Sequence, residues 1–154
     1  ARETKVENVL KHFINKKRVY NLFKKYLEIS NTQYDVILSI RIDIKLSSKF
    51  VFQYPKNNTI YIPEGQDWSG GINDQIAYGN LDVMKKYFHI IHNCNFILKN
   101  NLSNIGFHPE NLTLANIKLF KLNIERFKLQ YNIVRDLNYY TYNKESKYLN
   151  MFIK

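Results

Sequence analysis

The chain has 154 residues, enough for one domain and hardly for two, because a single hydrophobic core usually occupies roughly 100–200 residues. Its 45% hydrophobic and 15% aromatic content excludes a solvated coil, and five glycines with three prolines exclude collagen-like or linker-like sequence. A single cysteine, Cys94, excludes an internal disulfide and a structural zinc site built from several thiolates.

The charge balance favours anionic partners. There are 23 Lys and Arg residues against 13 Asp and Glu residues, a net charge of +10, which attracts phosphates, nucleic acid or acidic lipid. A second explanation is compositional, since the sequence is rich in Lys, Asn, Ile and Tyr throughout and such a bias places Lys on any solvated face. No apolar run approaches the roughly 20 residues that cross a bilayer, and the first residues are charged. We therefore expect a cytoplasmic protein without a transmembrane segment.

The first third of the chain predicts a helix and a strand. Spacings of three and four between apolar residues predict an amphipathic helix over residues 3–28, either continuous or broken near Asn15. Residues 34–44 are dense in β-branched and aliphatic side chains, which is typical of a strand buried on both faces, and we expect this strand to be central. It ends with apolar residues interleaved with Arg41 and Asp43. Because charges are costly to bury alone, partners or ligands must contact them.

The middle of the chain predicts short strands and a loop. Residues 50–54 and 59–62 are β-like runs around a turn, and we expect them to form a ribbon at the sheet margin. Residues 63–79 hold four of the five glycines, which permit positive φ and close approach of the backbone. We interpret this segment as a functional loop.

Two helices and a further β segment are expected next. Asn80 is a suitable N-cap for a helix over residues 81–98, and Pro109 suits the first turn of a helix that runs to Phe120. Imperfect alternation over residues 121–134 predicts one strand or a hairpin.

Taken in order, these elements predict a single α/β domain over residues 1–135, followed by a Tyr- and Lys-rich segment or tail at residues 136–154. In open α/β sheets, ligands bind beyond the carboxyl ends of the strands. Candidate functional residues are therefore expected where the strands end.

The first candidate motif is Arg41-Ile42-Asp43. Alternation along a strand places Arg41 and Asp43 on the same side. The carboxylate can bind Mg²⁺ or Mn²⁺ and the guanidinium can pair with phosphate oxygens, which suits a metal-bound diphosphate. The alternative from the tripeptide itself is an internal ion pair at a strand end.

The second candidate motif lies in the Gly-rich segment, over the residues WSGGINDQ. An aromatic platform, two glycines and short polar side chains are typical of a carbohydrate or nucleotide site. Asp74 can take a proton from an acceptor hydroxyl. The alternative is an ordinary surface loop in which Trp68 covers the core.

A third candidate is His108, directly before the helix-opening Pro109. Its imidazole can complete a divalent-metal site or bind phosphate, and the alternative is a structural hydrogen-bonding residue. The phosphate-loop, GxSxG and HExxH motifs are absent from the sequence, which disfavours an ATPase, a serine hydrolase and a zinc protease.

Several of these segments, in this order, resemble the later half of nucleotide-sugar-dependent glycosyltransferases with the GT-A fold. The resemblance runs from about Tyr34 to Arg135 and is carried by YDVILSIRIDI, NTIYIPEG, GGINDQIAYGN, FHPENL and YNIVR. It implies a GT-A-like mixed sheet flanked by helices that lacks part of the N-terminal nucleotide-binding region, which an upstream domain or second chain would complete. The implied activity is transfer of a sugar from a nucleoside diphosphate sugar to a hydroxyl of a glycan or other acceptor.

The resemblance also implies roles for particular residues. Arg41-Ile42-Asp43 stands where the family carries an Asp-x-Asp metal motif, so that Mn²⁺ or Mg²⁺ would rest on Asp43, with His108 where many such enzymes have a metal-binding His. WSGGINDQ is similar to the Trp-Gly-Gly-Glu-Asp-Asp acceptor loop of the galactosyltransferases. With Ile72 and Asn73 in place of acidic residues, Asp74 is the carboxylate left to act as base.

The other loop residues would bind substrate. Arg41 would neutralise the departing diphosphate, and the acceptor loop would contact the sugar through Trp68, Gly70, Gly71, Asn73 and Gln75. A glycosyltransferase predicts that Arg41, Asp43, Asp74 and His108 converge on one pocket. The alternative is a non-enzymatic basic module that binds nucleic acid or anionic surfaces through its Lys-rich helices and Tyr-rich C-terminal segment, with no such convergence.

Overall fold

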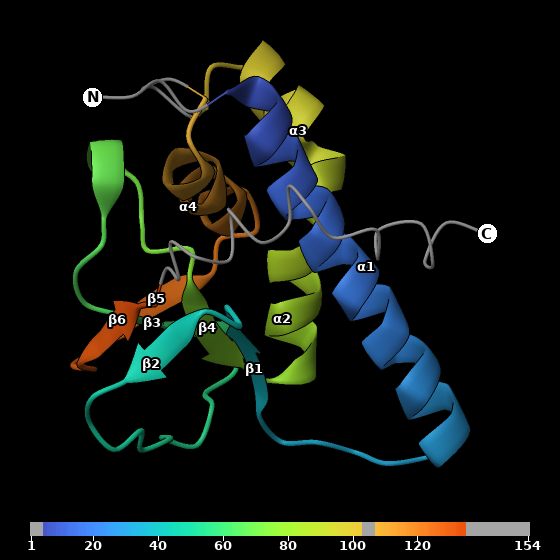
Figure 1. The fold of residues 1–154 in the computed structure, drawn as a ribbon. Helices are drawn as coiled ribbons and strands as arrows, with labels where there is room; N and C mark the ends of the chain where they lie inside the picture. The colour runs from blue at the N-terminus through green and yellow to red at the C-terminus, as the bar shows by residue number, and fades with distance from the viewer. Residues whose placement is uncertain (1–4, 103–106, 135–154) are drawn as a thin grey trace, which may run out of the picture.

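The computed structural model describes residues 5–102 and 107–134, and Figure 1 shows their arrangement. The strands are β1 (Ile37–Ile40), β2 (Ile44–Leu46), β3 (Thr59–Pro63), β4 (Ile76–Gly79), β5 (Asn123–Phe127) and β6 (Tyr131–Ile133). The helices are α1 (Val6–Ser30), the short 3-10 turn η1 (Trp68–Gly70), α2 (Leu81–Phe88), α3 (Ile90–Lys99) and α4 (Pro109–Leu119). A mixed sheet of order β1-β4-β3-β5 is flanked by helices, which confirms the expected α/β class. The predicted C-terminal segment, residues 136–154, lies outside the described residues.

The two central strands are β3 and β4, and both are buried along their whole length. The side chains of Ile60, Ile62 and Ala77 belong to the core shared with the helices. On the other face Tyr61 and Tyr78 stack with ring centroids 4.6 Å apart. Aromatic rings cover this second face, since those of Phe50, Phe52 and Phe127 pack edge-on against Tyr78. The sheet is therefore covered on both sides, which is why its central strands are apolar throughout.

Two predictions about strand position were wrong. Residues 34–44 do not form a central strand: β1 has four residues, lies at the sheet edge and pairs antiparallel with β4, and Leu38 and Ile40 remain 37% and 41% exposed. Residues 59–62 belong to the central β3 rather than to a marginal ribbon. A short aliphatic run fits both an edge strand and a central one, and the covering elements decide between them.

Residues 50–54 are not a strand. This segment covers the tyrosine face of the sheet, where the Gln53 backbone N–H donates to the Tyr78 hydroxyl at 3.2 Å. The following turn is fixed similarly, because the Lys56 backbone N–H donates to the Tyr61 hydroxyl at 3.2 Å. The aromatic content of residues 50–54 therefore reflects packing on the face of the sheet rather than strand pairing within the sheet.

The predicted helices are present, but some of their boundaries differ from the prediction. The first helix is continuous across Asn15, and the Pro109 helix forms as expected. Asn80 caps α2, since its Oδ1 accepts a hydrogen bond from the Val83 N–H at 3.0 Å. The single helix expected over residues 81–98 is divided at His89 into α2 and α3. No helix in the described part of the chain has the length and apolar character needed to cross a membrane.

The last β segment forms two strands that do not make a hairpin. β5 pairs parallel with β3, whereas β6 pairs antiparallel with β2 in a separate two-stranded sheet. The loop in the Gly-rich segment is also shorter than predicted, because the last four residues of that segment form β4. These pairings bring β6, the end of β1 and the loop before β4 to one end of the molecule (Figure 1).

Helix α1 packs along α2 and α3 (Figure 1). Tyr20 stacks on Phe88 with ring centroids 5.1 Å apart, and Val9 and Phe13 enter a second apolar cluster with α3 and α4. The N-terminal half of α1 is thereby held close to the loop that precedes β4.

That loop is docked tightly on the start of α4. A Cβ added to Gly71 would lie 2.3 Å from the backbone carbonyl carbon of Glu110 and 2.4 Å from the Asn111 nitrogen. The Ile72 N–H donates to the Glu110 carbonyl at 3.1 Å, and the Asn111 side-chain amide donates to the Ser69 carbonyl at 2.8 Å. Gly71 is therefore required for the close approach of two backbones.

Replacing Gly71 with alanine is expected to destabilise the fold by about 1–3 kcal/mol, because either the loop or α4 must move. The Gly65→Ala variant provides the comparison: Gly65 has a positive φ of 80°, which strains an alanine, but no atom lies within 4 Å of the added Cβ, whereas Gly71 has a φ of −87° and is limited by the contact itself. Urea denaturation of both variants tests this. A Gly71→Ala variant as stable as wild type contradicts the close approach of the loop to α4.

Candidate functional site

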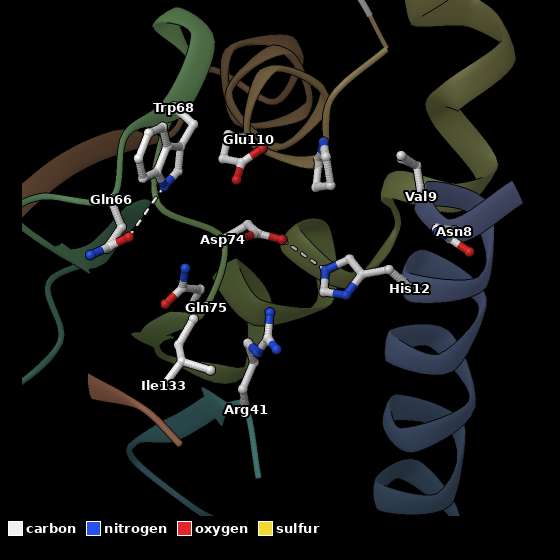
Figure 2. A pocket seen from close by; sticks show the side chains of 11 residues that line it. Asn8, Val9, His12, Arg41, Gln66, Trp68, Asp74, Gln75, Glu110 and Ile133 are labelled. Atoms are coloured by element: carbon white, nitrogen blue, oxygen red, sulfur yellow. Dashed lines mark hydrogen bonds and ion pairs between the residues drawn. The ribbon is translucent and has the colours of Figure 1, made fainter. Parts of the chain in front are cut away.

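A pocket of about 320 Å³ opens where five segments meet (Figure 2). Its lining comes from α1, the end of β1, the loop before β4, the start of α4, and β6: Asn8, Val9, His12, Arg41, Gln66, Trp68, Asp74, Gln75, Pro109, Glu110 and Ile133. Four residues that the sequence singled out, Arg41, Trp68, Asp74 and Gln75, therefore lie at one pocket.

Asp74 is the buried charge of this site, with 7% of its side chain exposed. Its Oδ2 lies 2.8 Å from Nε2 of His12 and 3.9 Å from Nζ of Lys16. Burial would raise the pKa of Asp74, but the His12 contact and the charges of Lys16 and Arg41 outweigh it and lower the pKa below its usual range. Asp74 is therefore an ionised carboxylate at neutral pH.

Lys16 fixes the backbone beside this carboxylate. Its ammonium donates to the Asp74 carbonyl oxygen at 2.7 Å and to the Tyr87 hydroxyl at 3.0 Å, and its side chain is 12% exposed. His12 lies one helical turn before Lys16. The His12 ring is turned so that its contact with Asp74 falls outside strict hydrogen-bond geometry, yet at 2.8 Å it still favours the ionised carboxylate.

The sequence interpretation assigned no function to His12 or Lys16. A signal was available in the helical register, because Lys16 lies three residues after the buried Phe13 and four before the buried Tyr20. A lysine on the buried face of a helix requires an anion, and the candidate anion was already known in Asp74.

Arg41 and Asp43 form a bidentate ion pair. Nε donates to Oδ1 at 2.9 Å and Nη2 donates to Oδ2 at 2.6 Å. The hydrogen bonds from Arg41 to Asp43 raise the pKa of the guanidinium against the opposing effect of burial, and the charge of Asp74 adds to the increase. The internal pair that the sequence left open as an alternative is therefore formed. Arg41 lines the pocket and Asp43 does not.

The predicted metal ligands are not assembled into a donor set. Both carboxylate oxygens of Asp43 accept from Arg41, and His108 occupies the N-cap position of α4 outside the pocket lining. Across residues 5–102 and 107–134, no three or more His, Cys, Asp or Glu side chains are grouped so as to hold a metal ion. The residues as placed do not fit the expected Mn²⁺ or Mg²⁺, so no chemical step below depends on a metal.

Two polar side chains of the loop differ in their surroundings. Asn73 is fully buried, and its amide donates to the Gly65 carbonyl at 3.1 Å and to the Tyr131 hydroxyl at 2.7 Å. Gln75 lines the pocket, and its buried Oε1 accepts no hydrogen bond within the described residues. Asn73 therefore holds the loop together, whereas Gln75 contributes to the pocket lining.

Trp68 stands at the pocket with 61% of its surface exposed, and its indole N–H donates to the Gln66 side chain at 3.2 Å (Figure 2). The following Gly70 adopts a positive φ of 74°, which lets the loop turn directly after this ring. Gly70 and Gly71 shape the loop and are not part of the pocket lining.

Glu110 is a second carboxyl group at the pocket. Burial raises its pKa and the charge of Asp74 raises it further, against the lowering effects of its own backbone N–H, His108 and Lys16. The pKa values of Asp74 and Glu110 are thus displaced in opposite directions. Such a separation between neighbouring carboxyl groups is typical of sites that donate and accept protons.

Two of the charged groups at the pocket have partners. Arg41 is paired with Asp43, and Asp74 contacts Lys16 and His12, whereas Glu110 forms no ion pair within the described residues. A ligand with several charges would have to break these pairs, whereas an uncharged ligand rich in hydroxyl groups would not. The arrangement therefore favours a neutral polar ligand with an apolar face for Trp68.

Comparison with known proteins adds no relative: no family model matches the chain, and neither a curated protein nor a solved structure matches it.

Asp74→Asn is expected to lower the free energy of unfolding at pH 7 by about 3 kcal/mol, because Lys16 loses its buried counter-charge. The folded-state pKa of Asp74 lies below its unfolded value, so the stabilisation is present above about pH 4 and is lost as the pH falls through the folded-state pKa. The difference between wild type and variant should therefore shrink between pH 5 and pH 2.

Urea denaturation across this pH range provides the measurement, with Asp35→Asn at an exposed aspartate as the control. The control is expected within about 0.5 kcal/mol of wild type at every pH. A stability difference for Asp74→Asn that is absent at pH 7, or that grows on acidification, contradicts an ionised buried carboxylate.

Proposed function

We propose that this pocket is the acceptor-binding and catalytic site of a GT-A-like glycosyltransferase, which transfers a sugar from a nucleoside diphosphate sugar to a hydroxyl group. One observation carries the proposal: Arg41 from the strand-end motif lines the same pocket as Trp68, Asp74 and Gln75 from the loop motif, whereas Asp43 and His108, which were also predicted to converge there, do not line it. The further nucleotide-binding region that the GT-A resemblance implies, in an upstream domain or second chain, belongs to this proposal.

The lining supports a sugar as the ligand. An exposed indole offers a face on which a pyranose ring can stack, and Trp68 provides it. The side-chain amide of Gln75 and the carboxyl groups of Asp74 and Glu110 line the pocket and can pair with hydroxyl groups. Since two carboxyl groups line the pocket and Arg41 is already paired with Asp43, the neutral acceptor fits this pocket better than the diphosphate of the donor.

The reaction requires two charge adjustments. As the acceptor oxygen bonds to the anomeric carbon, its proton must leave, and the departing diphosphate gains negative charge. Asp74 lies where it can orient the hydroxyl or take its proton. Arg41 retains an Nη1 without a hydrogen bond to any described residue, so it can donate to the leaving group while remaining paired with Asp43.

Trp68 is the single tryptophan in the sequence, so intrinsic fluorescence reports directly on this pocket. Titration of the full chain with a panel of methyl glycosides is expected to give a saturable change in Trp68 emission. Gln75→Ala should weaken the binding about fivefold, because one hydrogen bond from its side-chain amide is worth roughly 1 kcal/mol. The exposed Gln33 supplies the control, and Gln33→Ala should leave the binding unchanged.

The same titration separates this function from its alternative. A basic nucleic-acid-binding module would give no change with any glycoside, but a strongly salt-dependent change with single-stranded DNA or RNA. That result would overturn the assignment of the pocket to a sugar acceptor.

A further inference from the structure

His12 is the pocket residue that links the buried carboxylate to the open space. Its side chain is 25% exposed, compared with 7% for Asp74, and it lines the pocket. Figure 2 shows the imidazole extending from α1 toward Asp74, with one ring nitrogen at the carboxylate and the other on a different edge of the ring. No described residue forms a hydrogen bond with Nδ1 of His12.

The carboxylate lies 2.8 Å from Nε2, outside strict hydrogen-bond geometry but close enough to influence the tautomer of the ring. A carboxylate beside one imidazole nitrogen favours the tautomer that carries its proton there. With a proton on Nε2, the lone pair of Nδ1 is available to accept another. The same arrangement of carboxylate, imidazole and hydroxyl activates nucleophiles in unrelated enzymes.

Asp74 is poorly suited to accept the proton itself. Its carboxylate is almost fully buried and already contacts His12 and Lys16. The environment also lowers its pKa, which weakens it as a base near neutral pH. An imidazole with an available ring nitrogen is a common general base near neutral pH.

We propose that His12 is the catalytic base of the transfer reaction and that Asp74 is its positioning residue. This inference rests on the proposed function and assigns a role within it that the sequence motifs did not. The acceptor O–H bond breaks while the bond from its oxygen to the anomeric carbon forms, and the proton passes to Nδ1 of His12. The bond from the anomeric carbon to the phosphate oxygen breaks, and its electron pair leaves with the nucleoside diphosphate. The proton on His12 returns to solvent when the products leave.

The other titratable groups at this site are less suited than His12 to accept the proton. Lys16 on α1 is held by the Asp74 carbonyl and the Tyr87 hydroxyl and does not line the pocket. Arg41 after β1 remains protonated, since contact with Asp43 raises its pKa. Glu110 on α4 and the Tyr131 hydroxyl on β6 complete the titratable groups around Asp74, and both have raised pKa values.

The test compares His12→Gln with His92→Gln in the full chain. Glutamine keeps an N–H for Asp74 but accepts no proton near neutral pH, and His92 is an exposed residue of α3 outside the pocket. Release of nucleoside diphosphate is measured from UDP-glucose, UDP-galactose, UDP-N-acetylglucosamine and GDP-mannose, with methyl glycosides as acceptors, between pH 5 and pH 9. Thermal unfolding confirms that each variant is folded.

His12→Gln is expected to lower kcat about 10²–10³-fold, while the glycoside affinity measured by Trp68 fluorescence stays within about twofold of wild type. His92→Gln should match wild type throughout. If His12→Gln keeps the wild-type rate, His12 is not the base, although continued transfer leaves the proposed function intact.

If the wild-type chain releases no nucleoside diphosphate with any donor, this chain does not catalyse the transfer on its own, and the proposed function and this inference both fail for it. A second measurement needs no turnover: nitrogen NMR of the imidazole, assigned by comparison with His12→Gln, should show the Nε2–H tautomer in wild type and its loss in Asp74→Asn. An Nδ1–H tautomer in wild type overturns the assignment of His12 even if the variant fails to fold.

Discussion

The arrangement of this protein depends on one buried carboxylate. Asp74 lies at the end of the loop before β4 and is reached from α1 by His12 and Lys16, while Arg41 adds positive charge from the end of β1. An unpaired carboxylate in this position would be very costly, so the sheet and α1 can only come together with the positive charges of Lys16 and Arg41 in place. The same requirement places an imidazole at the pocket, which connects the stability of the fold to its proposed chemistry.

The loop around this carboxylate is organised by backbone approach and buried amides. Gly71 allows it to lie against the first turn of α4, and Asn73 ties it to the Gly65 carbonyl and the Tyr131 hydroxyl. These contacts expose Trp68 and Gln75 to the pocket. A rigid loop with a few outward side chains is how binding sites usually combine a fixed geometry with local variation.

The local parts of this account could be predicted from the sequence, and the relationships between distant parts could not. Asn80 and Pro109 marked their helices because capping and first-turn preferences act within a few residues. The position of β1 at the sheet edge was missed because its aliphatic residues fit either location. Within the candidate site, WSGGINDQ drew attention to Trp68, Asp74 and Gln75, but it treated Asn73 as a ligand-binding residue although its amide is used within the fold. His12 was missed because only the packing of α1 brings it to Asp74.

The central claim is that the charge interaction between Lys16 of α1 and the ionised Asp74 stabilises the packing of α1 on the loop. A double-mutant cycle tests it most directly. Lys16→Met, Asp74→Asn and the double variant are compared with wild type by urea denaturation at pH 7. Removing either charge leaves the other buried without its partner. The double variant should therefore lose less stability than the sum of the losses in the two single variants, with a coupling energy of about 1–3 kcal/mol. Additive losses, with a coupling energy near zero, would contradict the account.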